Sequence, residues 1–198
     1  LARHDLDDVV RYLEGHSEIN EVIFSGGDPL MADDGVLARF FQRLEAIPSI
    51  RRLRIHTRLP VVIPERVTDT FCQAIASIKI PVIFVLHINH ANEIDEALIN
   101  AVSRLRKVCR SILNQSVILG GINDSADDLI TLSERLFEAG IDPYYLNVLD
   151  RVSGAHHFDV PEKKLRILHQ ALLDALPGFL VPKLVKEVPG IGHKVLWK

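Results

Sequence analysis

The residue with the most distinctive chemical setting lies near the carboxyl-terminal end, where Lys194 follows two glycines in the stretch VPGIGHK. Glycines let a phosphate group or an aromatic ring approach the backbone, and a lysine amine beside them can form a Schiff base with an aldehyde. Lys194 is therefore a candidate covalent ligand of an aldehyde cofactor. The ordinary alternative is a solvated surface lysine, and a lysine taken alone favours that alternative.

A second candidate site is the stretch Ser25-Gly26-Gly27-Asp28-Pro29, which follows the first apolar run of the chain. The glycines allow a ligand to approach backbone amides, and the Asp28 carboxylate could bind an ammonium group. A tight turn closed by Pro29 explains the same residues equally well. The stretch is thus either a binding loop or a structural turn.

Polar side chains also interrupt two apolar runs in the middle of the chain. In an extended run, His87 and Asn89 point to the same side. His87 and His90 have no third ligand nearby in the sequence, which favours ordinary hydrogen-bonding histidines over a metal site. Asn114 and Gln115 lie within an apolar run, where buried amides need hydrogen-bonding partners or a ligand.

Short β-rich apolar runs alternate with longer stretches of helical spacing, a pattern typical of βα units and a parallel sheet. The predicted strands are 21–25, 53–57, 82–88, 112–119, 144–149 and 179–185. The predicted helices are 5–16, 33–46, 67–78, 93–108, 126–139 and 161–175. Functional groups of a parallel βα barrel collect at the carboxyl ends of its strands, where the candidate residues fall. We therefore predict an α/β fold, a partial (β/α) TIM-like barrel.

Composition narrows the class of protein. The 198 residues are 47% hydrophobic and carry a net charge of −3, which is typical of a folded protein and gives no electrostatic footprint for nucleic acid. The longest apolar runs are too short to cross a bilayer and the start lacks a signal-peptide pattern, so we expect a cytoplasmic protein without a membrane partner.

We expect a single domain over 1–198. Because the chain begins on a helix with no strand before it, we expect the barrel to be incomplete at its amino-terminal side.

Long ordered stretches of the sequence resemble the lysine 2,3-aminomutase family. They are EINEVIFSGGDPL at 18–30, RLRIHTRLPVVIPERVT at 52–68, HINHANEID at 87–95, LNQSVILGGIND at 113–124, PYYLNVLDRVSGAHHF at 143–158 and the terminal VPKLVKEVPGIGHK. Several long matches in the same order are far more specific than any single motif. Within the family, the resemblance is strongest to the bacterial branch that makes β-lysine for the modification of elongation factor P.

The resemblance implies a radical S-adenosylmethionine (SAM) partial barrel that uses a [4Fe-4S] cluster, SAM and pyridoxal 5′-phosphate (PLP). Lys194 matches the lysine that binds PLP covalently. The residues that match positions around SAM are Ser25, Gly26, Gly27, Asp28, His87 and Gln115. The implied reaction moves the 2-amino group of L-lysine to C3 through a 5′-deoxyadenosyl radical, with an electron donor for the cluster. The implied link to elongation factor P is indirect, through a separate ligase that uses β-lysine.

The resemblance also implies a substrate pocket. Taken alone, Asp150 is more often a salt-bridged loop acid. In the family comparison, Asp150 and Glu187 match the two acids that hold the substrate's ε-ammonium group, with Glu in place of Asp at position 187. Two carboxylates favour a cationic side chain and disfavour glutamate through charge repulsion. We therefore expect lysine as the substrate, although charge alone does not distinguish lysine from ornithine or arginine.

The sequence also departs from the family. Its CxxxCxxC cluster motif is absent, and Cys72 and Cys109 cannot replace three thiolates, so we expect the cluster ligands to lie outside this chain and the chain alone to be inactive. His193 stands where the family often has a small residue. The chain ends four residues after Lys194, so we also expect the chain to be incomplete at its carboxyl-terminal end.

Two alternative functions stay open: a non-catalytic barrel that binds PLP or lysine, and a non-radical Schiff-base enzyme such as a racemase.

Overall fold

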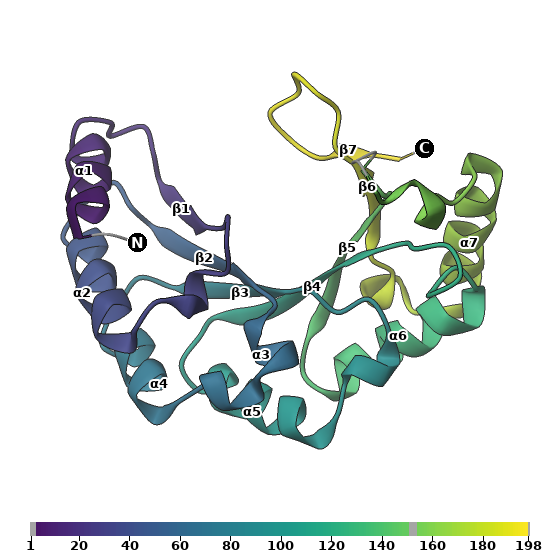
Figure 1. Cartoon of the computed structure of the whole chain (residues 1–198), viewed down its shortest axis with the longest axis horizontal. Helices are drawn as coiled ribbons and strands as arrows, with labels where there is room; N and C mark the ends of the chain where they lie inside the picture. The colour runs from purple at the N-terminus through teal and green to yellow at the C-terminus, as the bar shows by residue number, and fades with distance from the viewer. Residues whose placement is uncertain (1–2, 151–153, 198) are drawn as a thin grey trace. The chain divides into compact units, whose positions relative to one another are not determined.

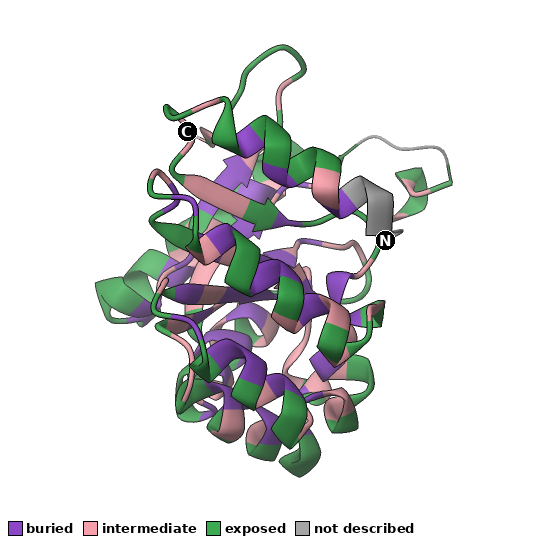
Figure 2. Cartoon of the chain, turned by 90° about the vertical axis from the view of Figure 1, so that its left-hand side faces the viewer, coloured by how far each residue is buried: buried purple, intermediate pink, exposed green. Residues whose placement is uncertain are grey.

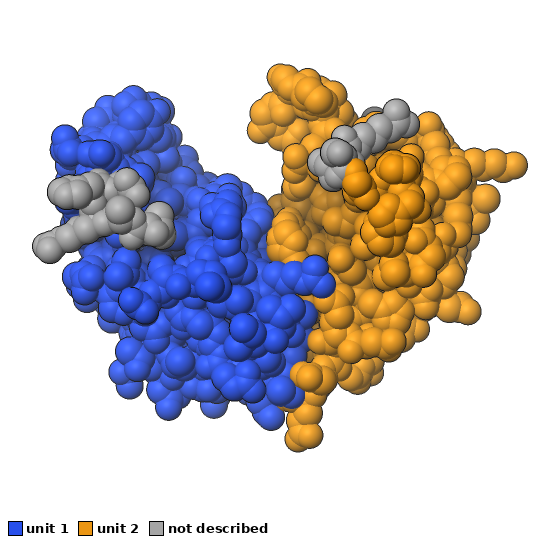
Figure 3. Space-filling view, viewed as in Figure 1, with its two compact units in different colours: residues 1–86, 97–112 blue, residues 87–96, 113–198 orange. Residues whose placement is uncertain are grey.

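The computed structural model describes residues 3–150 and 154–197, with helices and strands alternating along the chain (Figure 1). The chain forms two compact units, coloured separately in Figure 3. Unit 1 comprises residues 1–86 and 97–112, and unit 2 comprises residues 87–96 and 113–198. Neither a shift in composition nor a Pro/Gly/Ser-rich linker marks this division along the chain.

Unit 1 is built on parallel strands that pair in chain order. These strands are β1 (Glu21–Phe24), β2 (Arg52–Thr57) and β3 (Val82–Leu86). The helices of this part of the chain are α1 (Arg3–Glu14), α2 (Asp34–Glu45), the short α3 (Leu59–Val62), α4 (Asp69–Ala76) and α5 (Glu96–Arg106). Two 3-10 turns, η1 (Pro29–Met31) and η2 (Pro64–Arg66), complete the connections.

The unit 1 core holds aromatic rings from strands and helices. Phe24 of β1 packs edge-on against Phe40 and Phe41 of α2, with ring centroids 5.4 and 5.5 Å apart. Phe71 of α4 meets Phe84 of β3 in the same way. Buried and exposed residues alternate along the helices (Figure 2), as the amphipathic spacing in the sequence predicts.

Unit 2 also has parallel strands in chain order, followed by one antiparallel strand. The strands are β4 (Ser111–Val117), whose last five residues belong to unit 2, then β5 (Asp142–Asn147), β6 (Lys183–Lys186) and the antiparallel β7 (Val195–Leu196). The helices are α6 (Ala126–Glu138) and α7 (Glu162–Ala175). The 3-10 turns are η3 (Ala91–Glu93), η4 (His156–Phe158) and η5 (Gly178–Leu180). In the core of unit 2, leucines of α7 pack with Leu146 of β5; these leucines include Leu165, Leu168 and Leu172.

The structure confirms the predicted alternation of strands and helices and differs from it at a few boundaries. The predicted strand 179–185 begins too early, because residues 178–180 form a 3-10 turn before β6. The predicted helix 93–108 begins at Glu96, since His90 caps a separate 3-10 turn at residues 91–93. The strand 82–88 ends at Leu86, so His87 follows the strand. Helix α3 and strand β7 were not predicted.

No helix within residues 3–150 and 154–197 combines the length and apolar character needed to span a membrane.

Candidate functional site

A hairpin brings Lys194 next to Glu187. Strands β6 and β7 run antiparallel, and Lys186 lies opposite Val195. The same register continued by one residue places Glu187 opposite Lys194. The Lys194 amine donates a hydrogen bond to Glu187 Oε1 at 2.7 Å and forms an ion pair with it. The loop between the two residues is the yellow segment that extends beyond β6 in Figure 1.

A Pro-Gly turn closes this hairpin loop. The Ile191 N–H donates to the Val188 carbonyl at 3.1 Å. Gly190, at the third position of the turn, has a φ of +84°. Proline at the second position and a left-handed glycine at the third are typical of a type II turn, and another residue would be strained at Gly190.

The Lys194 amine contacts three different groups of unit 2. Besides Glu187, it donates to Asn147 Oδ1 at 2.9 Å and lies 5.8 Å from the centre of the Tyr145 ring. Asn147 is fixed in turn, because its Nδ2 donates to the Ser116 carbonyl at 2.9 Å. The side chain of Lys194 is only 23% exposed. The Lys194 amine is therefore fixed by hydrogen bonds and its side chain is largely buried. A surface lysine, which the residue type alone favours, would be solvated instead.

The Lys194 side chain lines a cavity of about 1080 Å³ in unit 2. The ionisable residues of the cavity wall include carboxylates that outnumber the lysines. The carboxylates are Asp150, Asp159, Glu162 and Glu187, the lysines are Lys186 and Lys194, and His193 is the remaining ionisable residue of the wall. The structure thus brings together three residues predicted from the sequence, namely Asp150, Glu187 and Lys194, and adds two further acids. Such a cavity favours a ligand that carries positive charge.

The predicted binding loop of unit 1 follows β1 and is exposed at Ser25, Gly26 and Gly27. Gly26 and Gly27 have φ values of +79° and +54°. A Cβ atom added to either glycine would meet nothing within 4 Å. The glycines are therefore required by the backbone conformation, and the loop keeps open space beside its backbone.

The Asp28 carboxylate is occupied by donors of its own unit. It accepts from the N–H groups of Leu30, Arg58 and Leu59 at 2.8–3.0 Å, and from Thr57 Oγ1 at 2.7 and 2.8 Å. These bonds tie the turn after β1 to the end of β2. For Asp28 the geometry therefore favours the structural turn over direct binding of an ammonium group.

His87 and Gln115, both in unit 2, contact each other. A hydrogen bond joins the Gln115 amide nitrogen to His87 Nε2. Gln115 Oε1 is buried and has no hydrogen-bond partner among the described residues. The neighbouring Asn114 side chain, 1% exposed, holds Ile88 by accepting from its N–H at 2.9 Å and donating to its carbonyl at 3.0 Å. A buried, unpaired amide oxygen beside a histidine fits a polar ligand that can donate a hydrogen bond.

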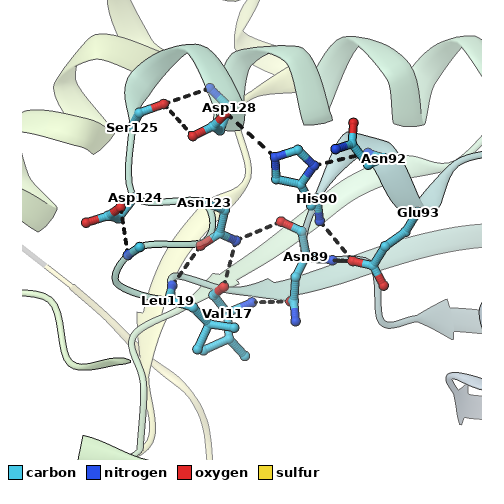
Figure 4. Close-up of polar contacts among 11 residues, drawn as sticks. Asn89, His90, Asn92, Glu93, Val117, Leu119, Asn123, Asp124, Ser125 and Asp128 are labelled. Carbon is cyan, nitrogen blue, oxygen red and sulfur yellow. Dashed lines mark hydrogen bonds and ion pairs between the residues drawn. The ribbon is translucent and has the colours of Figure 1, made fainter. Parts of the chain in front are cut away.

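A network of amides fixes the segment that carries His87 (Figure 4). Asn89 Oδ1 accepts from the Val117 N–H at 2.9 Å. The fully buried Asn123 donates to the carbonyls of Asn89 and Val117, and accepts from the Leu119 N–H. Asn123 therefore joins the segment after β3 to the end of β4 within unit 2.

The described residues do not provide ligands for an iron-sulfur cluster. Within residues 3–150 and 154–197, no group of three or more His, Cys, Asp or Glu side chains is arranged to hold a metal. Burial raises the pKa of the Cys109 thiol to about 11 and also raises the pKa of Cys72. Cluster ligands are thiolates, so these two protonated thiols do not fit.

Sequence reasoning missed Tyr145, Asn147, Asp159 and Glu162. Asn147 and Tyr145 lie inside a predicted strand, where nothing in the sequence distinguishes a cavity-side polar residue from a solvated one. The Glu187–Lys194 pair could have been predicted from the sequence, because a Pro-Gly turn between β-rich segments indicates a hairpin.

Comparison with solved structures identifies the fold. The chain is similar to a radical SAM methyltransferase from Sphaerobacter thermophilus, with a TM-score of 0.63 and 15% sequence identity over 91% of this chain and 56% of the other. It is also similar to Streptococcus suis SuiB, with a TM-score of 0.65 and 16% identity over 92% of this chain and 43% of the other. These matches confirm the predicted fold class, an α/β partial barrel.

The sequence comparisons give a narrower likeness. The chain is 50% identical over 186 residues to the L-lysine 2,3-aminomutase of Haemophilus influenzae, covering 94% of this chain and 55% of the relative. It is 50% identical over 181 residues to the L-lysine 2,3-aminomutase of Escherichia coli, covering 91% and 53%. The resemblance to the lysine 2,3-aminomutases is thus confirmed, and the chain spans about half the length of these curated relatives. No family model matches.

Proposed function

We propose that the protein containing this chain is a radical SAM, PLP-dependent lysine 2,3-aminomutase, which converts L-lysine to β-lysine. The observation that carries the proposal is the acid-lined cavity with the held amine of Lys194 in its wall. Relatives that bear this name at 50% identity support the reaction class. The further step, supply of β-lysine for the modification of elongation factor P through a separate ligase, rests on the sequence resemblance. The electron donor rests on the same resemblance.

Lys194 is the residue that would hold PLP. Its amine is oriented by Glu187 and Asn147, and the glycines of the 187–194 loop leave backbone open beside it. The cavity volume of about 1080 Å³ is at the upper end of ordinary ligand sites, so it accommodates a cofactor together with an amino acid. When bound, PLP supplies a π-system that allows nitrogen to move between adjacent carbons of a substrate radical.

For SAM we propose two sets of contacts. The exposed backbone at Ser25, Gly26 and Gly27 offers amide groups beside open space, and Asp28 keeps that loop in place through its hydrogen bonds. His87 and Gln115 are proposed contacts on the strength of the sequence resemblance and of the unpaired Gln115 Oε1. No step through the iron-sulfur cluster follows from this chain, because its described residues do not fit such a cluster.

The acids of the cavity give the substrate preference. Asp150 and Glu187 lie in the same wall as Asp159 and Glu162. A cationic side chain gains from these carboxylates, whereas glutamate is repelled and a neutral side chain gains nothing. The only support for the non-catalytic alternative, a barrel that binds PLP or lysine, is that the described residues include no ligand set for the cluster.

Substrate charge selectivity tests the proposal. We expect the PLP-loaded chain to bind L-lysine at least about tenfold more tightly than L-norleucine, which lacks the ε-amine, because the cavity acids pair with the ammonium group. L-glutamate should not bind. Asp150→Asn should remove most of this difference by weakening lysine and leaving norleucine unchanged. Isothermal titration calorimetry measures all three ligands.

The matched control is Glu134→Gln, which removes an exposed acid of α6. This variant should retain the full preference for lysine. Equal affinity for lysine and norleucine in the parent chain would refute a cation-selective pocket. A similar loss of preference in Asp150→Asn and Glu134→Gln would show that only the net charge of the protein matters.

A further inference from the structure

The loop after β1, residues 25–28, contains two adjacent glycines in the left-handed region. Gly26 and Gly27 have φ values of +79° and +54°, and a Cβ atom added to either would meet nothing within 4 Å. Because glycine adopts left-handed and right-handed conformations about equally, such a loop has many conformations when nothing fixes it. A ligand that has to order the loop loses affinity in doing so. The residues that fix the loop therefore contribute to the binding of its ligand.

Asp28 fixes the end of this loop through donors from two segments. Its carboxylate accepts the backbone N–H groups of Leu30, Arg58 and Leu59. It also accepts the Thr57 hydroxyl, whose oxygen lies 2.7 Å from Oδ1 and 2.8 Å from Oδ2. Thr57 Oγ1 in turn accepts the Leu59 N–H at 3.0 Å. The hydroxyl therefore connects the loop carboxylate to the backbone that follows β2.

Thr57 is itself fixed by the sheet of unit 1. It is the last residue of β2 and lies opposite Leu86 of β3, while β1 pairs with the other side of β2. Thr57 is only 2% exposed, so water does not compete for its hydroxyl. Its β-branched side chain has few rotamers, and a buried hydrogen bond to a carboxylate is stronger than one in water. The hydroxyl is therefore a rigid anchor for the Asp28 carboxylate.

We propose that Thr57 is a positioning residue of the 25–28 loop. Its buried hydroxyl orients the Asp28 carboxylate and thereby keeps Gly26 and Gly27 in the conformation that binds the ligand. That this ligand is SAM rests on the proposed function. The ordering of the loop by Thr57 does not, because it follows from contacts within unit 1.

Three substitutions separate the hydroxyl from the fold. Thr57→Val keeps the β-branched shape and removes the hydroxyl, whereas Thr57→Ser keeps the hydroxyl and removes a methyl group. Thr68→Val is the matched control, because Thr68 makes the same kinds of contact elsewhere in unit 1. Its hydroxyl donates to Asp34 at 2.6 Å and accepts the Phe71 N–H at 2.9 Å. Neither partner belongs to the 25–28 loop.

Hydrogen–deuterium exchange of the full gene product measures the order of the loop without any ligand. Thr57→Val should speed exchange in the peptide 25–30 by about tenfold, since a hydrogen bond to a charged group is lost beside the Leu30 N–H. Thr57→Ser should stay within about twofold of the parent protein. Thr68→Val should speed exchange at the start of α4, which Thr68 caps, and leave 25–30 unchanged.

Calorimetry with SAM, on the same protein reconstituted with iron and sulfide, measures the consequence for binding. We expect Thr57→Val to bind SAM about tenfold more weakly than the parent protein. Thr57→Ser and Thr68→Val should stay within about twofold. The affinity of Thr57→Val for L-lysine after PLP loading should be unchanged, whereas a general loosening of the protein would lower it as well.

The outcomes separate this inference from the proposed function. Unchanged exchange at 25–30 in Thr57→Val overturns the role of Thr57, and so does an equal loss of SAM affinity in Thr57→Val and Thr68→Val. Faster exchange with unchanged SAM affinity also overturns it, since the ordered loop then contributes nothing to binding. A parent protein that binds no SAM contradicts the proposed function, and the exchange result then decides on Thr57 alone. Thermal unfolding identifies folded variants, and Thr57→Ala replaces Thr57→Val if valine prevents folding.

Discussion

Lys194→Ala should abolish covalent attachment of PLP to this chain. The Lys194 side chain is 23% exposed and lies in the wall of the acid-lined cavity, and its amine is hydrogen-bonded to Glu187 and Asn147. A Schiff base requires an amine at a fixed distance from the cofactor aldehyde, and alanine has none. Incubation with PLP, reduction with borohydride and peptide mass mapping should place the adduct on Lys194 in the parent chain and detect none in the variant.

Two other substitutions act as controls. Lys186→Ala removes the other lysine of the cavity wall and should leave the adduct on Lys194 intact. Lys194→Arg preserves the positive charge without an amine that forms stable Schiff bases, and it should behave like Lys194→Ala. An adduct on Lys186 in the parent chain, or an undiminished yield in Lys194→Ala, would contradict the assignment of Lys194.

The second large effect concerns stability. Asn123→Ala should lower the free energy of unfolding by about 3 kcal/mol, because buried backbone groups lose their partners. The Asn123 side chain is fully buried and bonds to the Leu119 N–H and to the carbonyls of Asn89 and Val117 (Figure 4). Alanine satisfies none of these three groups. Urea unfolding followed by circular dichroism measures the difference.

Asn92→Ala is the matched control for this substitution. Asn92 is exposed in the adjacent 3-10 turn, and its backbone N–H, which alanine also has, donates to His90. We expect a change within about 0.5 kcal/mol. If Asn123→Ala destabilises no more than this control, the amide network does not stabilise the segment that carries His87.

The alternation of strands and helices was predictable because it depends on local periodicity. Strands β1 to β5 and helices α2, α6 and α7 lie within a few residues of their predicted ranges. The sixth strand was mispredicted, since apolar residues such as Phe179 and Leu180 look the same in a 3-10 turn as in a strand. The two-residue strand β7 was missed because its pairing with β6 is its defining feature.

The candidate site was only partly predictable for a similar reason. Lys194, Asp150 and Glu187 could be named from the sequence resemblance, and the structure places all three in one cavity wall. That Glu187 pairs with Lys194 itself required the hairpin register. Asn147 could not be identified, because its role depends on its contacts with Ser116 and Lys194, which are distant in the sequence.

Formation of β-lysine is the most direct measurement of the central claim. The full gene product that contains this chain would be purified without oxygen, reconstituted with iron and sulfide, and incubated with L-lysine, reductant, SAM and PLP. We predict β-lysine by mass spectrometry, and its loss when SAM is omitted or when Lys194 is replaced by alanine. A preparation with an intact cluster and bound PLP that forms no β-lysine would contradict the assignment as a lysine 2,3-aminomutase.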